Sequence, residues 1–336
     1  MPVLLIDIEA IGRNTETVAK MLRACGIDLI GVTKGCLGEP RVGAVMLAGG
    51  AVALADTRNE NLRRLRAALP NAELHRIYLP SLHKDFEPGD VTYISSLAGA
   101  SAVAGMAREY GTPREARRVM LQVETGDLRE GVPLEQLYEL AGAVTTDPRL
   151  ELAGISTNYA CFQGAPDAIR DSVGAIAGAA AQLRAAGIPV AHVSAGNSSL
   201  LWLLAEGEGL PEEVTELRCG EALLLGQDAL FYRALPGCCH DACVLRAEVL
   251  EGYTKPVREG GRRRLVLGVG RQDLGSGAVE FVDAGLRELG RSADYLVVEQ
   301  EEKRPEAGVG EMIDMIPSYE ALVSAWTSPY VELKLL

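Results

Sequence analysis

Short runs rich in Val, Ile and Leu recur eight times before residue 230, and a stretch rich in Ala, Leu, Glu and Arg follows nearly every one. This alternation is typical of β-α units that build a parallel sheet. Eight such units within about 200 residues favour a closed (β/α)8 barrel of the TIM type over an open doubly wound sheet. The expected strands are 29–34, 51–56, 73–79, 91–95, 118–124, 150–157, 190–194 and 214–218.

The pattern changes after Leu235-Pro236-Gly237, where strand-like runs follow one another with turn-rich linkers and little helix. These runs are 243–250, 264–268, 295–299 and 330–335. We therefore expect an α/β fold in which a barrel over residues 11–234 precedes a C-terminal β domain over residues 235–336. The N-terminal segment, residues 1–10, contains a further strand that we expect to pair with the C-terminal domain.

Composition excludes several other classes of protein. Hydrophobic residues make up 48% of the 336 residues and charged residues 24%, as in ordinary globular proteins and unlike disordered chains. A net charge of −13 opposes binding to nucleic acid. The N-terminus lacks the features of a signal peptide, and the longest weakly polar stretch, Ser172–Leu183, is too short to span a bilayer. We therefore expect a cytoplasmic protein without membrane partners, and its seven cysteines to be reduced thiols.

Lys34 ends the first expected barrel strand, in Ile30-Gly31-Val32-Thr33-Lys34-Gly35. Active sites of such barrels lie at the C-terminal ends of the strands. A lysine that emerges there from an apolar strand is partly desolvated, which lowers the pKa of its ammonium group and favours imine formation with an aldehyde. The alternative is a lysine that extends into solvent or forms a salt bridge.

A possible phosphate site follows the seventh strand, in Ser194-Ala195-Gly196-Asn197-Ser198-Ser199. Small residues let backbone N–H groups approach an anion, hydroxyls add donors, and barrels often bind phosphate at this place. A helix N-cap in a turn is the alternative. In the eighth strand, Arg218 brings a guanidinium group to the same mouth, although a structural ion pair would also explain it.

An imine-forming lysine, a phosphate cradle and a nearby cation together describe a pyridoxal phosphate (PLP) site. With these residues the chain resembles the alanine racemase family of fold-type III PLP enzymes, in the branch that contains ornithine racemases, and the resemblance covers essentially all 336 residues. The matching signatures are Val32-Thr33-Lys34-Gly35, Val123–Gly131, Gly154–Tyr159, Ser194–Ser198, Leu217–Glu221 and Ser318–Leu322.

The resemblance makes Lys34 the Schiff-base lysine and one catalytic acid/base. It places Arg218 against the pyridine nitrogen of the cofactor. Because an arginine does not give up its proton, that nitrogen would stay unprotonated and the cofactor would be a weaker electron sink. The resemblance assigns the other cofactor contacts to Asn158, Ser194, Asn197, Ser198, Gly220 and Tyr319.

The chain departs from the alanine racemases at the second catalytic base. Where those enzymes carry a tyrosine that completes the active site of the other subunit, this chain has Gly270-Arg271-Gln272-Asp273-Leu274. Racemisation needs a proton donor on each face of the planar intermediate. Cys161, Tyr330, Asp273 and a water molecule are the candidates. Two further family features are also absent, because Gln122 replaces a carbamylated lysine and Gly38 replaces an aromatic phosphate ligand.

These departures favour a basic substrate over alanine. The resemblance places Arg129 near the substrate carboxylate, and the distal ammonium group of a diamino acid would need a carboxylate partner. Asp127, Glu130 and Asp273 are candidates, and each could instead be a solvated loop acid. We therefore expect a PLP-dependent racemase of ornithine or another basic amino acid. The resemblance further implies a homodimer with active sites at the subunit interface.

Three other functions remain open at this point. They are an alanine or broad-specificity amino acid racemase, a non-enzymatic PLP homeostasis protein, and a lyase or decarboxylase on the same fold. A cluster of thiols and acids, Cys238–Cys243 with His240 and Asp241, could suggest a metal site. We expect no metal there, because a structural zinc site usually draws its ligands from two spaced pairs.

Overall fold

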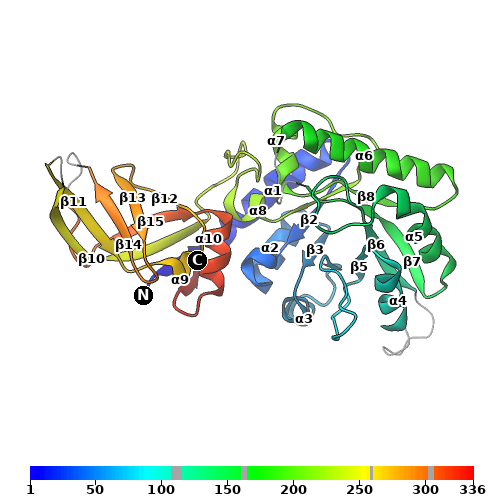
Figure 1. The fold of residues 1–336 in the computed structure, drawn as a ribbon, viewed down its shortest axis with the longest axis horizontal. Coiled ribbons are helices and arrows are strands. Elements are labelled where there is room, and N and C mark those ends of the chain that lie inside the picture. The colour runs from blue at the N-terminus through cyan, green and yellow to red at the C-terminus, as the bar shows by residue number, and fades with distance from the viewer. Residues whose placement is uncertain (107–115, 160–164, 258–259, 302–305) are drawn as a thin grey trace. The chain divides into compact units, whose positions relative to one another are not determined.

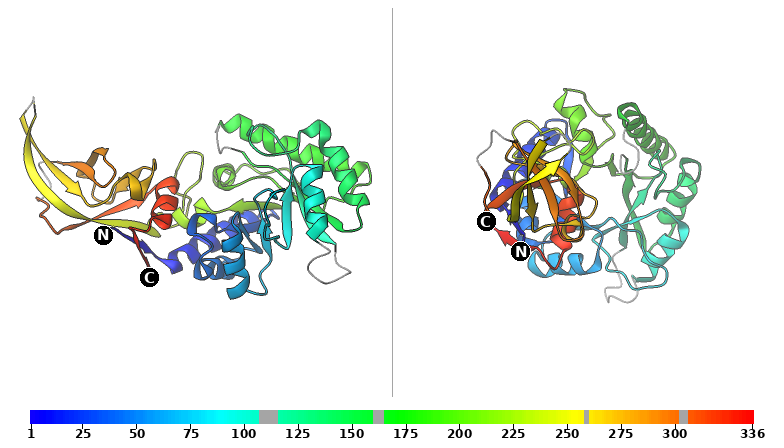
Figure 2. Two further views of the ribbon diagram at one scale, coloured as in Figure 1. Left: turned by 60° about the horizontal axis from the view of Figure 1, so that its bottom comes forward. Right: turned by 60° about the vertical axis from the view of Figure 1, so that its left-hand side comes forward.

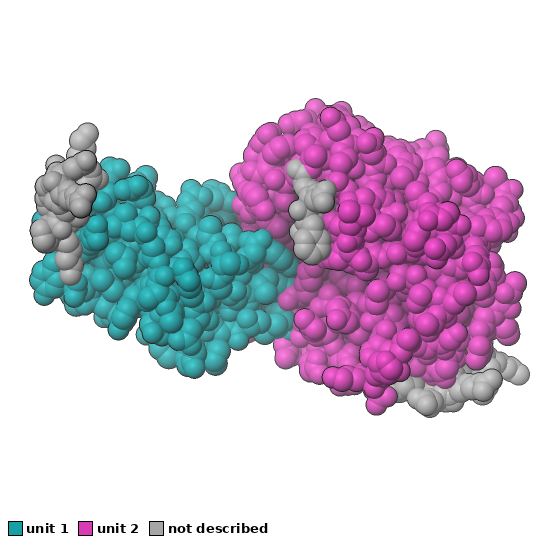
Figure 3. All heavy atoms as spheres, in the orientation of Figure 1, with its two compact units in different colours: residues 1–11, 35–37, 239–336 teal, residues 12–34, 38–238 magenta. Residues whose placement is uncertain are grey.

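The computed structural model describes residues 1–106, 116–159, 165–257, 260–301 and 306–336 (Figure 1). These residues form two compact units, which Figure 3 colours separately. One unit comprises residues 12–34 and 38–238, and the other comprises residues 1–11, 35–37 and 239–336. We call them the barrel unit and the β unit. No helix in the described ranges is long and apolar enough to cross a membrane.

The barrel unit contains eight parallel strands that close into a barrel in sequence order, as the alternating pattern predicts (Figures 1 and 2). The expected (β/α)8 fold is therefore confirmed. The strands are β2 (Asp28–Val32), β3 (Ala53–Asp56), β4 (Leu74–Arg76), β5 (Val91–Ile94), β6 (Arg117–Gln122), β7 (Leu150–Ser156), β8 (His192–Ser194) and β9 (Glu216–Cys219).

Most strands end earlier than the apolar runs suggest. Lys34, Glu124 and Thr157 were expected inside strands, but each follows the last paired residue. These residues lie instead in the turns that connect the strands to the following helices. This difference matters for the site, because it places functional groups in the connections that follow the strands.

Helices follow all but one of the barrel strands, and η1 and η2 are short 3-10 helices. They are α1 (Ile8–Arg23), which precedes β2, then η1 (Lys34–Cys36), α2 (Pro40–Ala48), α3 (Asn59–Ala68), α4 (Leu97–Met106), α5 (Leu134–Thr146), α6 (Pro166–Ala185), η2 (Ser198–Leu200), α7 (Leu201–Ala205) and α8 (Glu221–Leu225). In α6, Ile169, Val173, Ile176, Ala180 and Leu183 are buried at helical spacing, so one face packs inward while the rest meets solvent.

Alternate residues of the strands fill the barrel interior. Ile30 and Val32 of β2 pack with Ala53 and Ala55 of β3, and a second cluster includes Tyr93 of β5. Two-residue periodicity places such side chains on one face of each strand. The apolar side chains inside the barrel therefore form a packed core.

The β unit contains a mostly antiparallel sheet in the order β12-β15-β10-β11-β14-β13. Its strands are β1 (Val3–Ile6), β10 (Cys243–Val257), β11 (Gly260–Leu267), β12 (Val279–Phe281), β13 (Leu286–Arg291), β14 (Leu296–Gln300), β15 (Met312–Pro317) and β16 (Glu332–Leu335), with helices α9 (Arg271–Leu274) and α10 (Tyr319–Thr327). The N-terminal strand β1 pairs antiparallel with β10 and parallel with β16. The long, curved β10 is the yellow strand in the left view of Figure 2.

A charged cluster links β4 and β6 of the barrel. His75 Nε2 lies 2.9 Å from Glu73 Oε1, and Arg118 Nη1 donates to Glu73 Oε2 at 3.0 Å. The hydrogen bond with His75 lowers the pKa of the Glu73 carboxyl from its ordinary 4.5 to about 2, and Arg118 contributes in the same direction. The ionised carboxylate therefore stabilises the folded barrel above pH about 4.5.

This cluster gives a pH-dependent prediction. Because the pKa of Glu73 is lower in the folded than in the unfolded chain, its stabilising effect is lost as the pH falls from about 4.5 to about 2. The side chain is 40% exposed, so we expect no more than about 1 kcal/mol. Urea unfolding should show that the unmodified protein has a larger free energy of unfolding than Glu73→Gln at pH 6. This difference should become smaller towards pH 3. A difference that stays constant over this range would contradict the account.

Candidate active site

Lys34 is the first residue of η1, one residue after β2 ends, and is exposed. The residue before it, Thr33, is fully buried, and its hydroxyl donates to Asp56 Oδ2 at 2.7 Å. The Thr33 backbone N–H donates to Ala55 O at 2.9 Å, and its carbonyl accepts from Gly38 N at 3.1 Å. The backbone that carries Lys34 is therefore fixed on both sides of Thr33, while the lysine side chain remains accessible.

Asp56, the last residue of β3, organises this corner of the barrel. Its Oδ1 atom accepts hydrogen bonds from the backbone N–H groups of Thr57 and Arg58 and from Asn61 Nδ2, while Oδ2 accepts from Thr33. Asp56 was not among the residues predicted for the site. An acid at the end of an apolar strand, followed directly by the start of a helix, is the signal that could have indicated it.

Arg218 lies on β9 and is 5% exposed. Its Nη1 donates to Ser194 Oγ at 2.5 Å and its Nη2 to Thr157 O at 2.6 Å, and the guanidinium carbon is 5.3 Å from the centroid of the Tyr93 ring. Within the described ranges, no carboxylate oxygen comes within 4 Å of it. Its immediate partners are thus neutral, unlike those of the structural ion pair that we considered as an alternative.

The turn after β8 is a compact, hydrogen-bonded corner. Gly196 has a φ of +133°, a conformation that favours glycine. Asn197 caps η2 by accepting from Ser199 N at 2.8 Å, and its Nδ2 donates to Asn158 Oδ1 and to Tyr159 O, both at 2.9 Å. The N-cap that we considered as an alternative is therefore present, and the other end of the same side-chain amide joins the two asparagines that the resemblance assigns to the cofactor.

Ser198 and Gly220 lie at the starts of η2 and α8, the short helices that follow the neighbouring strands β8 and β9. Ser198 Oγ accepts from Ala222 N at 3.3 Å. A Cβ atom on Gly220 would come within 3.0 Å of Val32 O, two residues before Lys34, so a side chain there would crowd β2. Between them, the buried Cys219 thiol has a pKa raised to about 12 by desolvation, which keeps it protonated.

The loop after β6 is an acidic loop built around one arginine. Arg129 Nε lies 3.3 Å from Asp127 Oδ2, and Arg129 Nη2 donates to Glu130 Oε1 at 2.8 Å. The backbone N–H of Arg129 donates to Glu124 Oε2 at 3.2 Å. Two carboxylates, Asp127 and Glu130, thus contact the guanidinium, a third binds the backbone of the same residue, and Asp127 is only 3% exposed. The loop carries more negative than positive charge.

The expected site residues divide into three groups. The first group lies within or follows strands β2, β6, β7, β8 and β9, which are consecutive around the closed barrel, and comprises Lys34, Asp127, Arg129, Glu130, Asn158, Ser194, Asn197, Ser198, Arg218 and Gly220. Asp273 and Tyr319 belong to the β unit. Asp273 there accepts from Gly270 N and from Ser328 Oγ, and Tyr319 is the half-buried first residue of α10. Cys161 lies outside the described residues.

Gln122, which replaces the carbamylated lysine of some alanine racemases, ends β6. It accepts a hydrogen bond from Ser156 Oγ of the neighbouring strand β7 at 2.6 Å. Tyr330, another candidate proton donor, is 55% exposed in the β unit.

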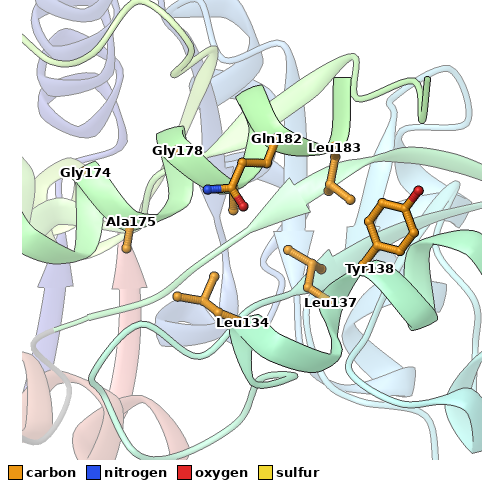
Figure 4. Close-up of a pocket in the computed structure, with 9 residues that line it drawn as sticks. Leu134, Leu137, Tyr138, Gly174, Ala175, Gly178, Gln182 and Leu183 are labelled. Carbon is orange, nitrogen blue, oxygen red and sulfur yellow. The ribbon is translucent and has the colours of Figure 1, made fainter. Parts of the chain in front are cut away.

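A separate groove of about 380 Å³ lies between helices α5 and α6 (Figure 4). Leu134, Leu137 and Tyr138 line it from α5, facing Gly178 and Gln182 of α6. It contains no charged side chain and lies on helices, away from the strand ends. We therefore do not assign the chemistry of the site to this groove.

The donor set at the strand ends fits PLP. The turn after β8 offers hydroxyl and amide donors with glycine at Gly196, the absence of a side chain at Gly220 lets the backbone approach β2 closely, and Arg218 supplies a buried guanidinium held by neutral partners. An accessible lysine, Lys34, follows the adjacent strand β2. These features suit an aromatic aldehyde with an anionic phosphate.

The chain belongs to the alanine racemase family. The family model described as alanine racemase, N-terminal domain, matches residues 6–228. A lysine racemase of Thermotoga maritima is 29% identical over 98% of this chain and 97% of its own length, and an ornithine racemase of Acetoanaerobium sticklandii is 28% identical over 100% and 99%. These full-length similarities support the class of enzyme expected from the sequence, a racemase.

Solved structures show the same fold. An alanine racemase from Corynebacterium glutamicum superposes with a TM-score of 0.76 at 18% identity, covering 100% of this chain and 99% of its own. An alanine racemase from Bartonella henselae, solved with covalently bound pyridoxal phosphate, gives a TM-score of 0.73 at 17% identity, with coverage of 100% and 99%. At least one structure with this fold thus holds PLP covalently.

Proposed function

We propose that this chain is a PLP-dependent racemase that interconverts the enantiomers of ornithine or another basic amino acid. The observation that carries the proposal is the joint position of Lys34, the turn after β8 and Arg218 on three neighbouring strands. The two full-length relatives named as lysine and ornithine racemases support the substrate class.

When bound, PLP would delocalise the electron pair left behind when the α-proton of an amino acid is removed. Lys34 would hold the cofactor and transfer a proton at its Nζ atom, since the turn around Thr33 keeps its backbone in place. Asn197, Ser198 and Gly220 would bind the phosphate group. Ser194 orients Arg218 through their hydrogen bond, and Asn158 is held by Asn197.

Arg218 would restrain the chemistry to proton transfer. Its guanidinium stays protonated and donates hydrogen bonds, so it would not give a proton to the ring nitrogen of the cofactor. A neutral ring nitrogen withdraws electron density less strongly than a protonated one, which favours prompt return of a proton to the α-carbon. The hydrogen bonds of the buried Arg218 to Ser194 Oγ and Thr157 O hold the side chain in one orientation for this role.

The loop after β6 supports a basic substrate. Arg129 would bind the α-carboxylate, and the surplus of carboxylates around it, Asp127 and Glu130 among them, would attract a distal ammonium group. Asp273 remains a further candidate for that ammonium, and Cys161 for the second proton donor. We also propose a homodimer with active sites at the subunit interface, on the strength of the family resemblance.

The function is tested by incubating the protein and PLP with L-ornithine, L-lysine or L-alanine in deuterated buffer. We expect loss of the α-proton signal in nuclear magnetic resonance spectra and formation of both enantiomers in chiral chromatography, fastest with a basic amino acid. Fastest exchange of alanine would contradict the substrate class. Absence of exchange with any amino acid would indicate a PLP carrier, and release of ammonia or carbon dioxide would indicate a lyase or a decarboxylase.

A further inference from the structure

A polar contact crosses the interior of the barrel. Tyr93 lies on β5 and Arg218 on β9, which are opposite each other in the closed order of eight strands. The guanidinium nevertheless lies 5.3 Å from the Tyr93 ring centroid, and both side chains are at most 5% exposed. The two side chains therefore meet inside the barrel, where apolar layers are the rule.

Glu216 lies on the same strand as Arg218, two residues earlier, and therefore on the same inward face of β9. It is 3% exposed. Its Oε2 atom lies 3.6 Å from His192 Nδ1 of β8, and its Oε1 atom has no hydrogen-bond partner among the described residues. A carboxylate so placed is costly unless another charge compensates it.

Tyr93 interacts electrostatically with both charges, Arg218 and Glu216. Burial raises the pKa of its hydroxyl above the ordinary value, so the group stays protonated and available as a donor. Among the described residues, its oxygen has no well-formed hydrogen bond. The tyrosine ring thus packs against the buried Arg218 guanidinium, and Glu216 shares one face of β9 with that cation.

Arg218 needs a counter-charge, because its hydrogen-bond partners are a hydroxyl and a carbonyl. Glu73, the residue before β4, already binds both His75 and Arg118. Glu216 is the buried acid that remains on the strand of Arg218.

We propose that Glu216 is the counter-charge of Arg218 and that Tyr93 couples the two, so that both act as positioning residues for the guanidinium at the barrel mouth. The pairing itself is a property of the barrel and needs no cofactor. Its effect on PLP rests on the proposed function. Removal of either charge leaves the other buried and unbalanced, whereas removal of both relieves the imbalance.

A double-mutant cycle tests the pairing on the protein without PLP. Urea unfolding is measured for Glu216→Gln, for Arg218→Met and for the double variant. Each single substitution should raise the equilibrium constant of unfolding by some factor. We expect the factor for the double variant to be about tenfold smaller than the product of the two single factors. The matched control pairs Arg218→Met with Glu73→Gln, an acid with other partners, and should be additive. Additivity for Glu216, or coupling of Glu216 to His192→Gln alone, would overturn the proposal.

A spectroscopic measurement decides the case if Arg218→Met does not fold. Glu216→Gln and Tyr93→Phe are loaded with PLP, and the wavelength of the bound-cofactor absorbance band is compared with that of the unmodified protein. We expect both variants to shift the band, and Glu73→Gln to leave it in place. A band unmoved in Glu216→Gln would overturn the proposal. Failure of the unmodified protein to bind PLP would instead refute the proposed function, and the unfolding cycle would still test the pairing.

Discussion

Replacing Lys34 with alanine is expected to abolish the absorbance band of bound PLP and to lower racemase activity at least about 1,000-fold. The variant loses both the amine that would hold the cofactor and a group that would transfer a proton. Because the Lys34 side chain is exposed and its backbone is held through Thr33, the fold should survive the change. Absorbance spectra and chiral chromatography of the purified variant measure the two effects.

The matched control is Lys20→Ala on helix α1. Lys20 is an exposed lysine paired with Glu16, and its loss should leave both the band and the activity unchanged. If Lys34→Ala keeps the band while its circular dichroism spectrum is that of the unmodified protein, the assignment of this lysine is wrong.

Replacing Asp56 with alanine is expected to produce the largest loss of stability, about 3–5 kcal/mol. The change removes the acceptor of four hydrogen bonds, to Thr33, Thr57, Arg58 and Asn61, at a fully buried position. The loss should also loosen the turn that carries Lys34. Urea unfolding at pH 7 measures the stability, and a PLP titration measures the effect on the cofactor site.

Glu60→Ala provides the comparison for Asp56→Ala. Glu60 is an exposed acid in the first turn of α3, close in sequence to Asp56, and its removal should change stability by less than about 0.5 kcal/mol. Equal effects of the two substitutions would show that the hydrogen bonds of Asp56 do not organise this corner.

The barrel could be predicted from the sequence because each strand-helix unit carries its own local pattern. Strands of a parallel barrel are covered on both faces, so each appears in the sequence as a nearly continuous apolar run. Fewer strands of the β unit could be predicted. Strands β12, β13 and β15 were not predicted. β12 has only three residues, β13 contains charged residues and a glycine in place of an apolar run, and β15 carries Asp314 within its apolar run.

The site was predictable where function depends on position at a strand end. Lys34, Ser194 and Arg218 could be selected because parallel strands of a barrel bring their C-terminal ends together. The roles of Glu216 and Tyr93 could not be inferred in this way. They depend on contacts within and across the closed barrel, and no local pattern records which strands face each other.

The loop after β6 shows a second limit of the sequence. Asp127 and Glu130 were expected to be candidate partners of a substrate ammonium group, but the sequence gives no sign that both also contact Arg129. Ion pairs within a loop depend on its backbone, and Leu128, with a φ of +53°, takes an uncommon left-handed conformation here. The three side chains should therefore be considered together when substrate binding is tested.

The attachment of PLP to Lys34 can be tested by loading the protein with PLP, reducing it with borohydride and locating the cofactor by peptide mass spectrometry. We expect a single labelled peptide, with the modification on Lys34. Absence of a label, or a label on another lysine such as Lys20 or Lys84, would contradict it.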